Sequence, residues 1–272
     1  MFPTTLLSYS AATVVCLLIV LIFPGSWSTG AILWGIVAGL SAVVGFACFY
    51  AAVAAGPITL VAPLIAVLGS AVPVLGALAT GGVLGAVSWV GIGIAVAGAG
   101  LISFQPGGSS SGPAASGISV RTGILSVVAG VTLGLSVIAL DRAPSDSGPT
   151  TALVELIVGL LVLLAVYLAS RGIRRVRVMT DRLDGDGFLP TPGKSAIVMG
   201  LTGGALLGIA NTLILAALQS GDLAIVSVLV GLYPIVTISL AAVIMRERIA
   251  PLQIVGVVFA IAASLLLAFG SA

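Results

Sequence analysis

The sequence predicts an all-α integral membrane protein with about nine transmembrane helices. Of its 272 residues, 60% are hydrophobic and only 7% are charged, whereas a soluble domain carries about 25% charged residues. No Asp, Glu, Lys or Arg occurs before Arg121, so this first part of the chain is expected to lie mostly in lipid. Apolar stretches of about 20 residues, the length that crosses a bilayer as a helix, recur between short polar breaks.

The first four predicted helices contain no charged residue. The chain begins MFPTTLLSYSAATVVCLLIV, without the positive start of a signal peptide and with an apolar stretch too long for one. We therefore interpret it as a retained first helix. Breaks that contain Gly, Pro or Ser separate the four segments, which cover residues 2–23, 30–53, 57–79 and 84–104.

The remaining five predicted helices lie in the part of the chain that holds all the charged residues. Their segments cover residues 121–141, 149–170, 196–218, 222–244 and 250–270. Two cysteines, Cys16 and Cys48, lie inside apolar runs, where a free thiol behaves as a small hydrophobic side chain. No disulfide is predicted from them.

Two connections are longer than a tight turn. QPGGSSSGPAASGIS, within residues 105–120, has the composition of a flexible linker. Residues 171–195 form a basic loop that we expect in the cytoplasm rather than on a nucleic acid. Arg121, Arg246 and Arg248 fall on the same side of a nine-helix count as this loop, and only Arg142 falls on the other. The loop contains Arg171, Arg174, Arg175, Arg177, Arg182 and Lys194.

The two halves of the chain resemble each other, which predicts a first repeat over 1–104 and a second over 121–272. Pro3-Thr4-Thr5 opens the first helix as Pro149-Thr150-Thr151 opens the sixth. Repeats with an odd number of helices insert in opposite orientations, and such inverted repeats usually indicate transport. The second half has five helices and the first half has four. Either a leading helix precedes the present start, or the first repeat is incomplete.

Residues 222–270 carry a recognisable pattern. It consists of a central proline (Pro234), a turn with Glu247 and Arg248, and then Gln253 and Gly256 in the last helix. In this pattern the chain resembles the drug/metabolite transporter superfamily, EamA type. The resemblance implies a ten-helix plan of two inverted five-helix repeats, with the first helix missing here.

The first half follows the same plan. Pro73 stands where the family has its central proline, and Gly91 stands at the last-helix glycine. The sequence TGGVLGA replaces the Glu-Arg turn in this half. We interpret Glu247, with Arg246 and Arg248, as an interfacial ion pair that stabilises a tight turn between two helices.

Glu155 is the one ionisable side chain placed clearly inside a predicted helix. Ionisable groups inside a membrane are costly and tend to line a cavity or pathway. Glu155 could accept a proton or face a cationic group, and its counterpart in the repeat is Tyr9. The alternative is a solvated carboxyl near the headgroups, or one paired with an Arg, that orients the helix.

Other polar side chains are candidates for a substrate or proton pathway. Asn211, Thr212 and Gln219 lie in one predicted helix, and Phe49 and Tyr50 lie in its repeat partner. The resemblance implies that these helices face a central cavity. The alternative is that they join helices through hydrogen bonds worth about 1 kcal/mol.

Prolines and glycines mark positions of unusual backbone within the helices. Pro73 and Pro234 remove backbone hydrogen bonds and could act as hinges or serve packing. Glycines at four-residue spacing allow helix backbones to approach closely, and we expect packing roles for them. These are Gly35 with Gly39, Gly130 with Gly134, and Gly200 with Gly204 and Gly208.

Enzyme signatures are missing from the sequence. It has no His, no P-loop, and its GIGIAVAG does not have the dinucleotide-binding spacing. We expect no catalytic residue, metal or cofactor. We expect a secondary transporter, a permease or exporter, that moves a small metabolite or drug-like compound across a bacterial plasma or inner membrane by alternating access. The alternative is a non-transporting scaffold or sensor with the same fold. Expected partners are membrane lipid and a small-molecule substrate, with proton coupling and a homodimer as open alternatives, and no nucleic acid.

Overall fold

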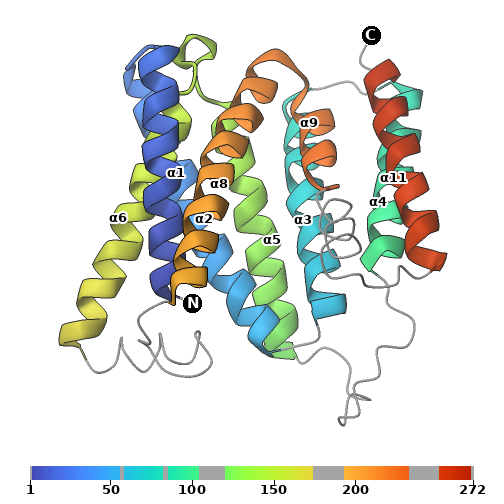
Figure 1. Ribbon diagram of the computed structural model, residues 1–272. Coiled ribbons are helices and arrows are strands. Elements are labelled where there is room, and N and C mark those ends of the chain that lie inside the picture. The colour runs from blue at the N-terminus through green and yellow to red at the C-terminus, as the bar shows by residue number, and fades with distance from the viewer. Residues whose placement is uncertain are drawn as a thin grey trace. The chain divides into compact units, whose positions relative to one another are not determined.

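A computed structural model describes residues 2–55, 58–81, 85–103, 120–173, 193–232 and 251–270. Throughout these residues the regular structure is helical, and none of them forms a β-strand (Figure 1). The predicted fold class of an all-α protein is confirmed for this part of the chain.

The observed helices begin and end within a few residues of the predicted segments. Of the segment predicted over 222–244, only the first part is described, so Pro234 and the turn with Arg246, Glu247 and Arg248 lie outside the described residues. A short 3₁₀ turn, η1 (Ser145–Ser147), precedes the sixth helix. The α-helices are α1 (Phe2–Ile22), α2 (Thr29–Ala55), α3 (Ile58–Ala79), α4 (Ala86–Ser103), α5 (Val120–Asp141), α6 (Thr150–Gly172), α8 (Lys194–Ser220), α9 (Leu223–Val230) and α11 (Pro251–Gly270).

Five of these helices, α1, α2, α5, α6 and α8, are long and apolar enough to cross a membrane. Shorter apolar stretches of described residues lie within α3, α4 and α11. Many of the outward side chains are large and hydrophobic, such as Leu21 and Met199, each 70% exposed. A helix satisfies its own backbone hydrogen bonds, which is why it can present such a surface to lipid.

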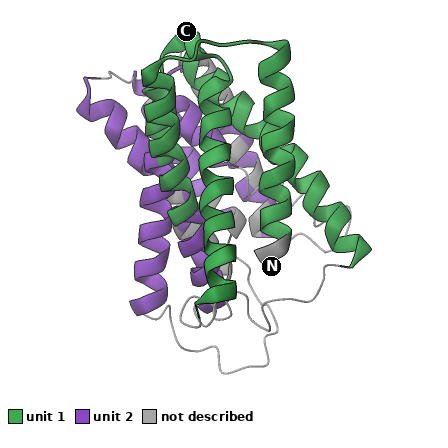
Figure 2. Ribbon diagram, turned by 90° about the vertical axis from the view of Figure 1, so that its left-hand side faces the viewer, with its two compact units in different colours: residues 1–44, 136–220 green, residues 45–135, 221–272 purple. Residues whose placement is uncertain are grey.

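The chain folds into two compact units, coloured separately in Figure 2. Unit 1 contains residues 1–44 and 136–220, and unit 2 contains residues 45–135 and 221–272. Each unit therefore draws on both halves of the sequence. The division into repeats at the linker describes the sequence pattern, and it stays a prediction.

In unit 1, α1 and α8 pack through small residues. A Cβ added to Gly204 would overlap the backbone of Ser8, and one added to Gly208 would meet the Ala12 carbonyl. The Ser8 hydroxyl donates across this contact to the Gly200 carbonyl oxygen at 2.9 Å. The packing role predicted for these three glycines is confirmed, because only glycine lets the two backbones come this close.

The other helix contacts of unit 1 converge on α6. A Cβ on Gly39 of α2 would lie 2.7 Å from the Glu155 carbonyl oxygen. From α1, the Tyr9 ring lies over Gly159 of α6, where an added Cβ would be 2.5 Å from the Tyr9 Cε1. The first two turns of α6 are buried as a result.

In unit 2, α4 packs against α11, and α3 packs against both α4 and α9. A cluster of buried side chains joins these helices and includes Val74, Ala95, Ala224 and Ala263. The sequence alignment of the two halves matches α3 with α9 and α4 with α11, so helices matched in sequence are neighbours in space. Pro73 is buried in α3, and a Cβ on Gly134 of α5 would lie 3.1 Å from its Cδ.

Candidate functional site

The carboxyl group of Glu155 is buried in unit 1 and held by two neutral side chains. The residue is 6% exposed, although α6 begins only five residues earlier, at Thr150. Its Oε2 accepts a hydrogen bond from Asn211 Nδ2 of α8 at 2.8 Å. Its Oε1 accepts one from the Ser136 hydroxyl, near the end of α5, at 3.3 Å. Three helices therefore meet at this carboxyl group.

This environment differs from the alternative of a solvated carboxyl at the headgroups. Burying an ionised carboxylate is costly unless a cation or several hydrogen bonds compensate. The two partners of Glu155 seen among the described residues are a hydroxyl and an amide, which are both uncharged. A carboxyl group so placed can carry a proton or receive a cationic group.

Small residues allow the helices to converge on Glu155. Gly39 brings α2 against the backbone of α6 at this point, and Gly159 accepts the Tyr9 ring one turn further on. The site thus joins Glu155 with Asn211, and the Tyr9 ring of α1 packs against α6 one turn away, at Gly159. These are three of the residues nominated from the sequence.

A second polar contact joins α8 to η1 and the turn that precedes α6, and it lies about two helix turns along α8 from the first. Gln219 Nε2 donates to the Ser147 hydroxyl at 3.2 Å and to the Gly148 carbonyl oxygen at 3.3 Å. The Thr151 hydroxyl donates to the same Ser147 oxygen at 3.0 Å. Between this contact and that of Glu155, α8 places the buried, apolar Leu215. The two polar contacts are therefore separate.

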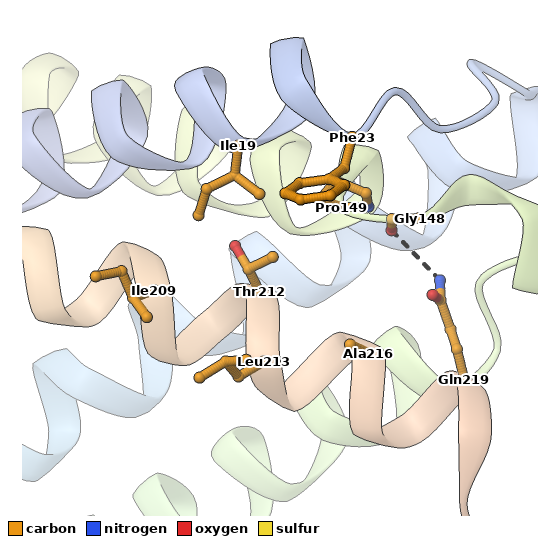
Figure 3. A pocket seen from close by; sticks show the side chains of 9 residues that line it. All are labelled: Ile19, Phe23, Gly148, Pro149, Ile209, Thr212, Leu213, Ala216 and Gln219. Atoms are coloured by element: carbon orange, nitrogen blue, oxygen red, sulfur yellow. Dashed lines mark hydrogen bonds between the residues drawn. The ribbon is translucent and has the colours of Figure 1, made fainter.

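Beside this second contact is a pocket of about 370 Å³, which lies wholly within unit 1 (Figure 3). Its lining is almost entirely apolar, with Thr212 and Gln219 as the polar side chains. Thr212 follows Asn211 directly in α8, so the pocket and the Glu155 site share one helix turn. The residues that line it are Ile19, Phe23, Gly148, Pro149, Ile209, Thr212, Leu213, Ala216 and Gln219.

The remaining nominated residues lie elsewhere. Tyr50 belongs to unit 2 and is 38% exposed. Its ring and that of Phe49 are nearly perpendicular, with a centroid distance of 5.5 Å. Pro73 is also in unit 2, and Pro234 lies outside the described residues. In the described part of the chain, no group of three or more His, Cys, Asp or Glu side chains is placed to hold a metal ion.

Sequence reasoning missed Ser136 and Ser147. Serine and threonine in apolar helices often bond the carbonyl one turn earlier in their own helix. Ser126 and Thr132 do so here. No feature of the sequence separates Ser136 from these, so only the tertiary structure identifies it as a partner of Glu155.

Comparisons with known proteins identify a family and a fold. The family model described as the EamA-like transporter family matches residues 121–269, which is more than half of the chain. Among solved structures, 26 chains match. One, described as "Crystal structure of protein", is 15% identical with a TM-score of 0.71, and the match covers 99% of this chain and 88% of that one. Such a likeness shows the fold. No curated protein matches significantly.

Proposed function

The chain belongs to the EamA-like transporter family, and from this premise we propose that it moves a small metabolite or drug-like organic compound by alternating access. The family belongs to the drug/metabolite transporter superfamily, so the resemblance seen in the sequence is confirmed. The chain is a multi-pass membrane protein of a transporter family, which is not a family of enzymes. We place it in the bacterial plasma or inner membrane.

We further propose that transport is coupled to protons through Glu155. The observation that carries this proposal is the buried carboxyl group, hydrogen-bonded to Asn211 at 2.8 Å and surrounded by neutral partners. A carboxyl group in such a place changes its charge by one when it takes up a proton, and a buried charge is costly. Protonation therefore changes the relative free energies of two conformations that expose the group differently.

Other residues have supporting roles in this proposal. Asn211 orients the carboxyl group, and the Tyr9 ring of α1 packs against Gly159 of α6, one turn from Glu155. Thr212 and Gln219 border the substrate route at the nearby pocket of unit 1, and Tyr50 is a separate candidate for a pathway within unit 2. Pro73 and Pro234 serve as hinges. Lipid and the small-molecule substrate are the partners.

The test uses the purified protein in proteoliposomes. A pH-sensitive dye inside the vesicles reports proton movement while compounds from a metabolite and drug library are added outside. Wild-type protein is expected to move protons when a substrate is present, and Glu155→Gln is expected to lose this signal. Glutamine keeps the shape and can still accept a hydrogen bond from Asn211, so the variant is expected to fold.

Tyr9→Phe is the matched control because it keeps the ring against Gly159 and leaves the carboxyl group in place. Its proton signal should persist. Proton-linked flux that is unchanged in Glu155→Gln would overturn the coupling role and leave transport itself intact. If no library compound produces flux, the alternative of a non-transporting scaffold or sensor is favoured.

A further inference from the structure

The two hydrogen-bond partners of the Glu155 carboxyl group respond differently to a proton. Asn211 Nδ2 donates to Oε2 at 2.8 Å, and an amide nitrogen cannot accept a hydrogen bond. The Ser136 hydroxyl donates to Oε1 at 3.3 Å, and a hydroxyl oxygen also has lone pairs that accept. The longer and weaker of the two contacts is therefore the one that can reverse its direction.

The hydroxyl hydrogen of Ser136 has a second acceptor within its own helix. Serine and threonine inside helices commonly donate to the carbonyl four residues earlier. In α5, Ser126 bonds the carbonyl oxygen of Thr122 in this way at 2.8 Å. For Ser136 the equivalent acceptor is the Thr132 carbonyl, and turning the side chain about one bond is enough to change from one acceptor to the other.

Other titratable side chains near Glu155 come from α1. The buried Cys16 thiol interacts electrostatically with the carboxyl group, and the Tyr9 ring lies one turn away at Gly159. A thiol and a phenol are both neutral near pH 7. The groups that α2, α5 and α8 bring to Glu155 do not titrate, and they are Gly39, Ser136 and Asn211. A proton taken up here therefore resides on the carboxyl group itself.

We propose that Ser136 is the positioning residue of this proton site, so that the proton binds to Oε1 of Glu155 and is held there by Ser136 Oγ. The inference rests on the proposed role of Glu155 in proton coupling. When Oε1 gains the proton, its new O–H donates to Ser136 Oγ, and the serine hydrogen turns to the Thr132 carbonyl. The bond from Asn211 to Oε2 persists in both charge states. A proton on Oε2 would instead face the Asn211 donor, and the whole amide would have to turn over.

This arrangement leaves no polar atom of the pair unpartnered in either charge state. A buried donor or acceptor without a partner is costly, so a carboxyl group that alternates between two charges needs a neighbour that can both donate and accept. Ser136 meets this requirement and Asn211 Nδ2 does not.

The test is infrared difference spectroscopy of the purified full chain in deuterated buffer at acid pH. Subtracting the spectrum of the same protein with Glu155→Gln isolates the neutral carboxyl group, and its O–D stretch reports whether that group donates a hydrogen bond. In the wild type the stretch is expected at the low frequency of a bonded O–D. Ser136→Ala is expected to shift it to the higher frequency of a free O–D, and Ser136→Thr, which keeps the hydroxyl, to restore it.

Two further variants show whether the shift is specific. Ser126→Ala removes a hydroxyl from the same helix and should leave the O–D stretch unchanged. Asn211→Leu removes the donor to Oε2, so it should raise the C=O stretch but leave the O–D stretch at its bonded position. An O–D stretch that Ser136→Ala leaves unchanged, or that Asn211→Leu shifts instead, overturns the role of Ser136 while proton coupling through Glu155 stands. If the wild type shows no neutral carboxyl band that Glu155→Gln removes, the coupling itself fails, and this inference fails with it.

Discussion

Two adjacent glycines of α8 have opposite surroundings, and this contrast tests the packing of unit 1. A Cβ on Gly204 would overlap the backbone carbonyl group of Ser8 in α1, whereas a Cβ on Gly203 would meet nothing within 4 Å. Backbone atoms cannot turn aside as the end of a side chain can. Alanine is therefore expected to be harmless at one position and damaging at the next.

The expected size follows from three contributions. Alanine is favoured over glycine in a helix by about 1 kcal/mol, so Gly203→Ala should gain up to about that much. For Gly204→Ala, overpacking costs about 1–3 kcal/mol. A weakened hydrogen bond between Ser8 and the Gly200 carbonyl, 2.9 Å in length, adds about 0.6 kcal/mol. The gain in helix propensity applies to both variants and cancels, so their free energies of unfolding should differ by the last two contributions, about 1.6–3.6 kcal/mol.

The assay is equilibrium unfolding in mixed micelles with increasing sodium dodecyl sulfate. Fluorescence of the chain's three tryptophans, one of which is Trp34 of α2, reports the transition. Gly204→Ala should unfold at lower detergent fraction than the wild type, and Gly203→Ala at an equal or higher fraction. If the two variants were equally stable, the close contact of α1 with α8 would be wrong.

Three further substitutions can be measured by the same unfolding assay. Asn211→Leu leaves the buried carboxyl with one fewer donor and should cost about 1–3 kcal/mol, and an unchanged stability would contradict the 2.8 Å contact. Asp222→Ala removes the side chain that accepts from the Ala224 amide at 2.8 Å at the start of α9; we expect a loss of about 0.5–2 kcal/mol, most of it restored by Asn. Tyr9→Ala should cost about 3–5 kcal/mol by leaving a cavity over Gly159, and a Tyr9→Phe variant that lost as much would argue against ring packing as the cause.

The helices themselves could be predicted from the sequence because their positions depend on local hydrophobicity and length. The segment predicted over 121–141 is observed as Val120–Asp141, and that over 2–23 as Phe2–Ile22. A chain in lipid must satisfy its backbone hydrogen bonds within each span. A stretch that is long and apolar enough to cross the membrane is therefore expected to be helical.

The candidate site was only partly predictable. Glu155 could be singled out because a carboxyl group in an apolar helix is rare, and Asn211 was nominated on similar grounds. Their hydrogen bond joins residues 56 positions apart in the sequence, and no spacing rule connects them. The hydrogen bond from Gln219 to the Gly148 carbonyl joins residues 71 positions apart, so it too required the folded structure.

The glycines show where the two kinds of information separate. The sequence by itself determined that Gly39 and Gly204 would lie at close helix contacts, that the chain spans the membrane, and that it resembles its family. Only the tertiary structure decided that Gly39 meets α6 and that Gly204 meets α1. The physical reason is that lipid is as apolar as the interior of a helix bundle. Both sides of such a helix are therefore hydrophobic, and the pattern that assigns an inner face in a soluble protein is missing.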